Sequence, residues 1–263
     1  MLRASGIQVN PAASVNPAGP VEAVSADGNR FMSSIVENIK DLNERIEDAC
    51  ARVSRGPKEI TVVGVTKTVE PARIQQAVDA GMTVLGENRI QEAASKIDAV
   101  RGPVTWHLVG HLQRNKVKKA ITMFDMIQSV DSLELALEID KRSEQVGKVM
   151  DTLVEVNTSG EETKYGIAPE KAVDLIGEIS HLNNITVRGL MTIGTFTDDE
   201  GLIRDCFRTL RELGERVATS GIRRAEMKYL SMGMTSDYEL AIEEGSNMIR
   251  IGTAIFGARF CQP

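Results

Sequence analysis

The chain has 263 residues and a formal net charge of −6 at pH 7, so it lacks the basic surface that nucleic-acid binding requires. Hydrophobic residues make up 42% of the chain and aromatic residues only 4%, which indicates a globular protein with an aliphatic core and excludes disorder over most of its length. The length is also ordinary for a single α/β barrel.

The three cysteines, Cys50, Cys206 and Cys261, are odd in number and widely spaced. They predict neither a disulfide framework nor a thiolate metal site, and a reducing compartment is the simplest interpretation. No apolar run reaches the roughly 18 residues that span a bilayer, and the N-terminus lacks the apolar core of a secretory signal. We therefore expect a cytoplasmic protein with no membrane segment.

Residues 1–30 are rich in Ala, Pro, Ser, Val and Gly without periodicity, which predicts a disordered tail, with a transit peptide as the alternative. Ordered structure is expected over residues 31–263, as one domain. Ser34 and Glu37 form a capping box in front of an apolar face at helical spacing. Gly56 and Pro57 are expected to end that first helix.

Eight short apolar runs follow, separated by longer amphipathic stretches. The strands are expected at residues 60–66, 82–85, 104–109, 124–130, 152–156, 186–193, 227–230 and 247–251. The helices between them are expected at residues 71–80, 89–100, 115–123, 132–146, 169–182, 200–220 and 236–244. Strict alternation implies parallel strands joined by right-handed crossovers. This predicts a single (β/α)8 TIM barrel with an extra N-terminal helix; an open doubly wound sheet is less favoured, because no Gly-rich fingerprint follows the first strand.

The first strand ends in Val65-Thr66-Lys67, at the end of the barrel where active sites form. Alternation puts Val63, Val65 and Lys67 on one side. An inward lysine at the barrel mouth would be partly desolvated, which favours the free amine and its attack on a carbonyl to form an imine. The alternative is a solvated cation at the strand end.

Two later segments could bind an anion. Ser231 and Gly233 follow the seventh strand, where the Ser236 side chain, with Glu239, is expected to open the next helix. Gly252 and Thr253 follow the eighth strand, and their amides can face phosphate oxygens. Either segment also occurs in ordinary turns, so neither identifies a ligand alone.

Arg250 lies in the eighth strand, where its side chain is expected to point into the barrel. A buried guanidinium needs a partner, which could be an internal carboxylate such as Glu87 or Glu155. If a pyridine ring lay between Lys67 and the phosphate segments, Arg250 could instead donate to the ring nitrogen and keep it unprotonated. Asn88, after the second strand, is expected at the same rim, although it could equally cap a helix.

His107 and His111 have the spacing of metal ligands on a helix, but they fall on a strand and the turn after it. They share no helical face, so we expect no metal site. The basic residues that follow, within 114–119, indicate a solvated helix face or a guide for an anionic ligand.

Seven segments of the chain carry a resemblance to a known family by their order and spacing. They are Val65-Thr66-Lys67-Thr68, Gly86-Glu87-Asn88-Arg89, residues 106–116, Lys164-Tyr165-Gly166, Gly189-Leu190-Met191, Leu230-Ser231-Met232-Gly233-Met234 and residues 250–257. Together they closely resemble the pyridoxal phosphate homeostasis protein family, whose barrel is similar to the N-terminal domain of bacterial alanine racemases. The resemblance extends from Ser34 to Phe260.

The resemblance implies pyridoxal 5'-phosphate (PLP) as the cofactor, held as a covalent imine on Lys67. It further implies that Arg250 faces the pyridine nitrogen and that Asn88 lies beside the ring. The phosphate would be held by Ser231, Gly252 and Thr253. Two departures affect the rim: residues 192–195 lack the proline often found there, and the N-terminal tail is additional.

The function implied is PLP homeostasis by a monomer that is not an enzyme and that makes transient contacts with PLP-dependent apoenzymes. The alternatives are a single-domain PLP-dependent amino-acid racemase and a lysine-imine aldolase acting on a sugar phosphate. A racemase needs a second acid/base on the opposite side of the substrate, and no stretch is left to build the domain that supplies it. An aldolase would need no coloured cofactor.

Overall fold

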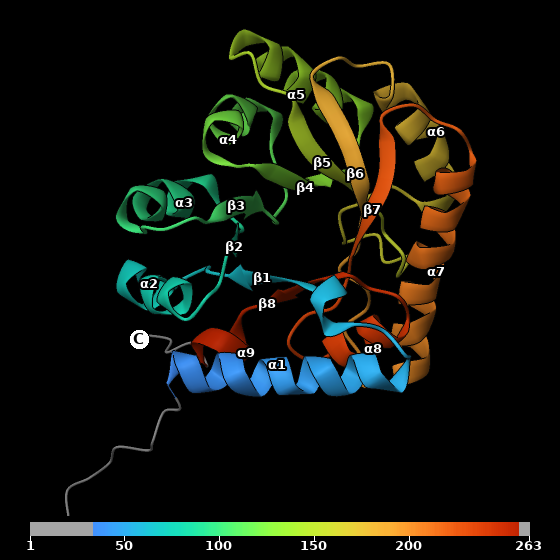
Figure 1. Cartoon of the computed structure of the whole chain (residues 1–263). Helices are drawn as coiled ribbons and strands as arrows, with labels where there is room; N and C mark the ends of the chain where they lie inside the picture. Colours follow the sequence, from blue (N-terminus) through green and yellow to red (C-terminus); the bar gives the residue numbers. More distant parts are fainter. Residues whose placement is uncertain (1–33, 258–263) are drawn as a thin grey trace, which may run out of the picture. The chain divides into compact units, whose positions relative to one another are not determined.

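The structure is a computed structural model that describes residues 34–257. The predicted tail at residues 1–30 and Cys261 lie outside the described residues. Eight parallel strands pair in chain order and close into a barrel, so the predicted (β/α)8 TIM barrel is confirmed (Figure 1). The strands are β1 (Thr61–Val65), β2 (Val84–Glu87), β3 (Thr105–Leu108), β4 (Met126–Val130), β5 (Met150–Glu155), β6 (Ile185–Met191), β7 (Ala225–Ser231) and β8 (Met248–Ile251).

Helices alternate with the strands. They are α1 (Ile35–Arg52), α2 (Pro71–Asp79), α3 (Ile90–Lys96), α4 (Val117–Met123), α5 (Leu133–Gln145), α6 (Pro169–Ile179), α7 (Glu200–Thr219), α8 (Tyr238–Glu243) and α9 (Thr253–Phe256), with 3-10 turns η1 (Pro57–Glu59), η2 (Ile97–Ala99) and η3 (Arg114–Lys116). The predicted capping box at Ser236 is wrong, because α8 begins two residues later. Its N-cap is Asp237, whose carboxylate accepts a hydrogen bond from the Met234 amide at 2.6 Å.

The extra N-terminal helix is confirmed, together with its capping box. The Ser34 hydroxyl accepts from the Glu37 amide at 3.1 Å, and the Glu37 carboxylate accepts from the Ser34 amide at 2.8 Å. The buried face of α1 packs in one apolar cluster with Ile249 and Ile251 of β8 and with Tyr238 of α8. Figure 1 shows α1, in blue, alongside α8 and α9. The helix therefore covers the outside of the barrel where β8 meets β1.

Apolar side chains separate into two layers, as the alternation of a strand requires. Val63, Met126, Leu153, Met191 and Met248 form one small cluster. These five residues come from strands β1, β4, β5, β6 and β8, which can meet only inside the barrel. A much larger cluster lies between the strands and the surrounding helices. Apolar side chains therefore fill only part of the barrel interior, and buried polar side chains such as Gln128 and His107 lie beside them.

Candidate functional site

Four consecutive strands of the closed barrel bring the predicted site residues to one edge. β7 ends at Ser231, β8 carries Arg250, β1 leads into Lys67 and β2 leads into Asn88. β7 pairs with β8, β8 pairs with β1, and β1 pairs with β2, all parallel. Since parallel strands present their carboxyl ends at one side, these residues share the barrel mouth. Lys67 is half-buried in the turn after β1.

A buried ion pair between Lys96 and Glu87 stabilises the turns after β1 and β2. Lys96 donates to the Glu87 carboxylate at 2.5 Å and to the carbonyl of Thr66 at 2.7 Å. The same carboxylate accepts from the Thr66 hydroxyl at 2.7 Å and from the Asn88 amide at 3.1 Å. Glu87 is fully buried. It therefore organises the residue before Lys67 and the backbone of Asn88, and it is not the partner of an inward arginine.

The residue after Lys67 is also fixed. Thr68 has a φ of 61°, in the left-handed region that residues other than glycine seldom adopt. Its amide donates to the Glu92 carboxylate at 3.0 Å. Such conformations persist only when their surroundings impose them, and they gather at functional sites. The turn that carries Lys67 is thus anchored at the residues before and after it.

Arg250 is buried, with 5% of its surface exposed. One terminal nitrogen donates to the Ser231 hydroxyl at 2.7 Å, and the other donates to the carbonyl of Thr192 at 2.7 Å. Burial lowers the pKa of Arg250 to about 10, against the opposing charges of Glu155 and Asp237, so the side chain is a cation at neutral pH. Within residues 34–257 it forms no ion pair with Glu87 or Glu155, and the internal salt bridge considered above is wrong.

Gly233 allows the turn after β7 to pass close to α8. Its φ is 94°, and a Cβ there would lie 2.9 Å from the Cα of Tyr238 and 2.6 Å from the Cβ of Ala241. Gly252, by contrast, has no such requirement: a Cβ would meet the Val65 carbonyl at an ordinary 3.4 Å. The packing of the described residues therefore explains why position 233 needs glycine, but it does not explain the glycine at position 252.

The turns after β7 and β8 lie side by side. The Ala254 amide, in the first turn of α9, is 3.4 Å from the Thr235 hydroxyl. Thr253 opens α9, so its amide has no intrahelical acceptor. Two loops of the chain thus present hydroxyls and main-chain donors at the same edge as Lys67.

Two buried acceptors at the mouth have no hydrogen-bond partner among the described residues: Asn88 Oδ1 and Glu155 Oε2. Asn88 does not cap α3, whose N-cap is Arg89, so that alternative is wrong. Glu155 ends β5 with 2% of its surface exposed. The pKa of Glu155 is raised to about 7, mainly by burial and further by the charge of Asp131, with Arg250 opposing both.

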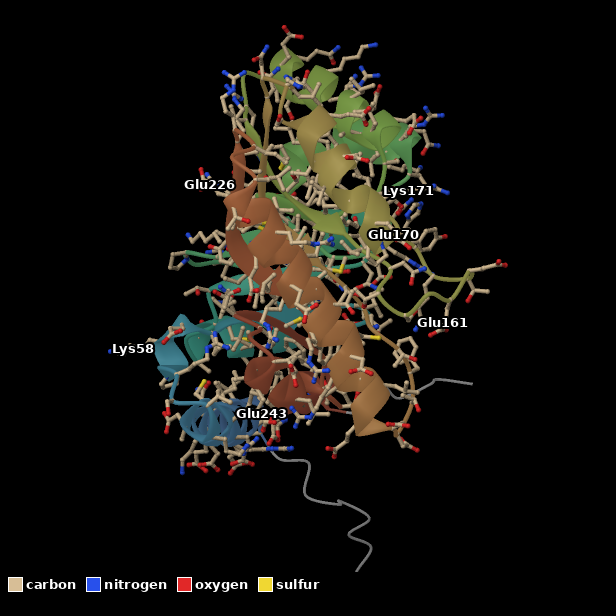
Figure 2. All side chains as sticks on the ribbon, turned by 90° about the vertical axis from the view of Figure 1, so that its right-hand side faces the viewer. Lys58, Glu161, Glu170, Lys171, Glu226 and Glu243 are labelled. Atoms are coloured by element: carbon tan, nitrogen blue, oxygen red, sulfur yellow. The ribbon has the colours of Figure 1, made fainter. Side chains whose placement is uncertain are left out.

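The β5–α6 and β6–α7 loops, which include the departure at residues 192–195, are bound to each other. Lys164 donates to the Glu161 carboxylate at 2.6 Å and to the carbonyl of Gly194 at 2.7 Å. Figure 2 shows Glu161 on the β5–α6 loop, away from the body of α6 marked by Glu170 and Lys171. The loop also places Tyr165 against His111, with ring centroids 3.8 Å apart. Polar contacts therefore connect these two loops of the rim, although residues 192–195 contain no proline.

The two histidines considered as metal ligands lie in different surroundings. His107 is buried and its Nδ1 is 2.9 Å from the Gln128 side chain, whereas His111 stacks on Tyr165. Across residues 34–257, no group of three His, Cys, Asp or Glu side chains could hold a metal ion. The basic residues Arg114 and Lys118 are exposed on η3 and α4.

Sequence reasoning missed three residues of the mouth. Gln128 and Thr192 contact Ser231 and Arg250 respectively, and Glu155 was considered only as an ion-pair partner. A glutamine inside the apolar run 124–130 was the available signal, because a polar residue in a buried strand must find a partner.

In the described part of the chain, no helix combines the length and apolarity needed to cross a membrane.

Comparisons with known proteins agree with this geometry. The family model for the N-terminal domain of alanine racemase matches residues 35–260. The "Pyridoxal phosphate homeostasis protein" of Aquifex aeolicus is 41% identical over 224 residues, covering 85% of this chain and 97% of that protein. The protein of the same name from Pasteurella multocida is 36% identical, covering 86% and 98%.

Solved structures give the same result. PipY of Synechococcus elongatus, determined with PLP bound, is 31% identical with a TM-score of 0.75, covering 85% of this chain and all of that one. An alanine racemase of Clostridium difficile is 16% identical with a TM-score of 0.69, and this chain covers 58% of it, which shows a shared fold alone. The chain therefore belongs to the alanine racemase N-terminal domain family and, within it, to the pyridoxal phosphate homeostasis proteins.

Proposed function

We propose that this protein binds PLP in the barrel mouth, attached covalently to Lys67, and acts in PLP homeostasis. The observation that carries the proposal is the convergence of Lys67, buried cationic Arg250 and the Gly252 turn on adjacent strands. The names of the relatives and the PLP bound to PipY support it. We extend the proposal to a monomer in the cytoplasm that passes PLP to dependent apoenzymes.

The residues present fit this cofactor. A phosphate needs donors and positive charge, and the start of α9 offers the Thr253 amide, which has no intrahelical acceptor, beside the turn that begins at Ser231. Gly252 is not required by the packing of its neighbours, so close approach of a ligand gives a reason for it. The partnerless acceptors of Asn88 and Glu155 require a donor, which a polar ligand can supply.

Each residue would contribute a distinct property. Lys67 would supply the ε-amine that holds the aldehyde carbon of the cofactor, with one water molecule released on attachment. Arg250 has donors only, so it can meet a ring nitrogen that carries a lone pair and disfavours its protonation. Gly252 and Thr253 hold the phosphate, and Asn88 lies beside the ring. Bound PLP would supply an electron sink, which an unprotonated ring nitrogen weakens.

The same arrangement supports a role without turnover. An arginine at the ring nitrogen suits a held cofactor better than strong carbanion stabilisation. The relatives at 35–41% identity are named for homeostasis. Proton exchange at the α-carbon of an added amino acid in deuterated water would instead indicate a racemase.

The test is covalent trapping. Purified protein is mixed with PLP, its visible spectrum is recorded, and borohydride reduction is followed by peptide mass spectrometry. We expect the cofactor mass on Lys67 and its loss in Lys67→Ala with the fold retained. Lys58→Ala is the matched control, since Lys58 is exposed in η1, before β1 and away from the mouth. Cofactor attached to another lysine would refute the assignment, and a colourless protein that takes up no PLP would favour an aldolase.

A further inference from the structure

A chain of hydrogen bonds runs through the barrel interior from Arg250 to His107. Arg250 donates to the Ser231 hydroxyl at 2.7 Å, and that hydroxyl donates to Gln128 Oε1 at 2.7 Å. Gln128 Nε2 is 2.9 Å from His107 Nδ1. The four residues come from β8, β7, β4 and β3, and none is more than 6% exposed.

The direction of every bond in this chain follows from Arg250 together with the orientation of the Gln128 amide, whose carbonyl oxygen faces Ser231. A guanidinium has no acceptor, so the Ser231 oxygen must accept from Arg250. The Gln128 carbonyl oxygen lies 2.7 Å from that hydroxyl and carries no proton, so the hydroxyl donates to it. The amide nitrogen of Gln128 lies on the other side and donates to His107. His107 therefore accepts at Nδ1 and carries its proton on Nε2.

The surroundings of His107 agree with a neutral ring. Burial lowers the pKa of His107 to about 4, although the charge of Asp125 opposes this. A protonated ring would present N–H at Nδ1 and lose its bond to Gln128. The neutral ring is thus the form that the hydrogen-bond chain requires at physiological pH.

Ser231 has no proton left for a phosphate. Phosphate oxygens accept hydrogen bonds, and the only hydroxyl proton of Ser231 is already used inside the barrel. The hydroxyl also contributes one of two contacts that fix the guanidinium plane, the other being the carbonyl of Thr192 at 2.7 Å. Removing it would leave Arg250 attached at one side.

We propose that Ser231 and Gln128 are positioning residues that hold Arg250 for the ring nitrogen of the cofactor, and that the Ser231 hydroxyl does not bind the phosphate. This inference rests on the proposed function, and it assigns phosphate binding to Gly252, Thr253 and the main chain after Ser231. His107 closes the chain as its final acceptor.

The first experiment needs no cofactor. The sequence contains three histidines, His107, His111 and His181, so 15N NMR of the apo protein can follow each ring, with His111→Gln and His181→Gln for assignment. We expect His107 to show an Nε2–H tautomer that does not titrate between pH 5.5 and 8. In Gln128→Glu the carboxylate cannot donate, so the His107 tautomer should switch or its titration should move to higher pH. An Nδ1–H tautomer in the unaltered protein would overturn the hydrogen-bond chain.

The second experiment separates positioning from phosphate contact. Affinities for PLP and for pyridoxal, which lacks the phosphate, are compared in Ser231→Ala and in the matched variant Thr253→Val, each of which loses one hydroxyl. We expect Ser231→Ala to weaken both ligands by a similar factor, about five- to tenfold for one hydrogen bond, and to shift the pH midpoint of the cofactor spectrum. Thr253→Val should weaken PLP alone.

The outcomes are distinguishable. Loss of PLP affinity in Ser231→Ala with unchanged pyridoxal affinity would show a phosphate contact and refute the positioning role. Failure of the unaltered protein to bind either ligand would refute the proposed function and leave the NMR result on His107 standing. If Ser231→Ala did not fold, the tautomer of His107 would still decide the hydrogen-bond chain.

Discussion

Replacing Glu155 with glutamine should stabilise the protein, and by an amount that grows with pH. The carboxyl group is 2% exposed and one of its oxygens has no partner. Burial is the main reason that its pKa is raised from 4.5 to about 7. Because the folded state binds this proton more tightly than the unfolded chain does, its stability falls as pH rises through the interval between these two values.

The magnitude follows from the same two values. Each tenfold change in an acid constant is worth about 1.4 kcal/mol, so the ionised carboxylate costs the folded state about 3 kcal/mol at pH 8. At pH 5 the group is protonated in the folded protein and the cost is below about 1 kcal/mol. Glu155→Gln keeps the size and removes the charge, so it should recover these amounts.

Urea unfolding of the apo protein at pH 5 and pH 8 measures the difference. Glu161→Gln is the control, since Glu161 is exposed and its hydrogen bond with Lys164 lowers its pKa, which gives the opposite sign and no gain at pH 8. Equal effects of Glu155→Gln at both pH values, or a loss of stability at pH 8, would refute the claim that the buried carboxylate is uncompensated.

Two further predictions concern the residues that shape the mouth. Lys96→Met leaves the carboxylate of Glu87 buried without its cation, so the free energy of unfolding at pH 7 should fall by about 3–5 kcal/mol. Adding Glu87→Gln to this variant should restore most of the lost stability. A loss below about 1 kcal/mol in Lys96→Met alone would contradict the stabilising role of the pair. Gly233→Ala should lower the free energy of unfolding by more than about 1 kcal/mol, because the φ of Gly233 is positive. Gly252→Ala should change the free energy of unfolding by no more than about 1 kcal/mol, but it should lower PLP affinity at least tenfold. Unfolding and PLP titration check both, and equal PLP affinity in Gly252→Ala would exclude close approach of a ligand there.

The architecture could be predicted because it depends on periodicity and order. Alternating apolar runs and amphipathic stretches lead to parallel pairing, and eight repeats suffice to close a barrel. Element ends were less predictable. The helix expected at residues 236–244 begins at Tyr238, since the Asp237 carboxylate binds the Met234 amide and keeps the preceding turn out of the helix.

The partners of the inward polar side chains could not be predicted, because they depend on which strands face one another across the barrel. On sequence grounds, Glu87 and Glu155 were both available as partners of Arg250. In the folded chain Lys96 forms an ion pair with Glu87, and Arg250 donates hydrogen bonds to Ser231 and Thr192. Strand alternation gives the side on which a residue lies, but not the neighbour that it meets.

By itself the sequence determined the strand and helix order, the N-terminal capping box and the positions of the chemically capable residues, because each depends on neighbours within a few residues along the chain. Only the tertiary structure decided that Glu87 belongs to a buried ion pair, that Glu155 retains an unpaired oxygen, and that the Ser231 hydroxyl belongs to a chain ending at His107. The chain from Ser231 to His107 joins strands far apart in sequence that the barrel brings within hydrogen-bonding distance, whereas the Glu87–Lys96 pair depends on how α3 packs against the turns after β1 and β2.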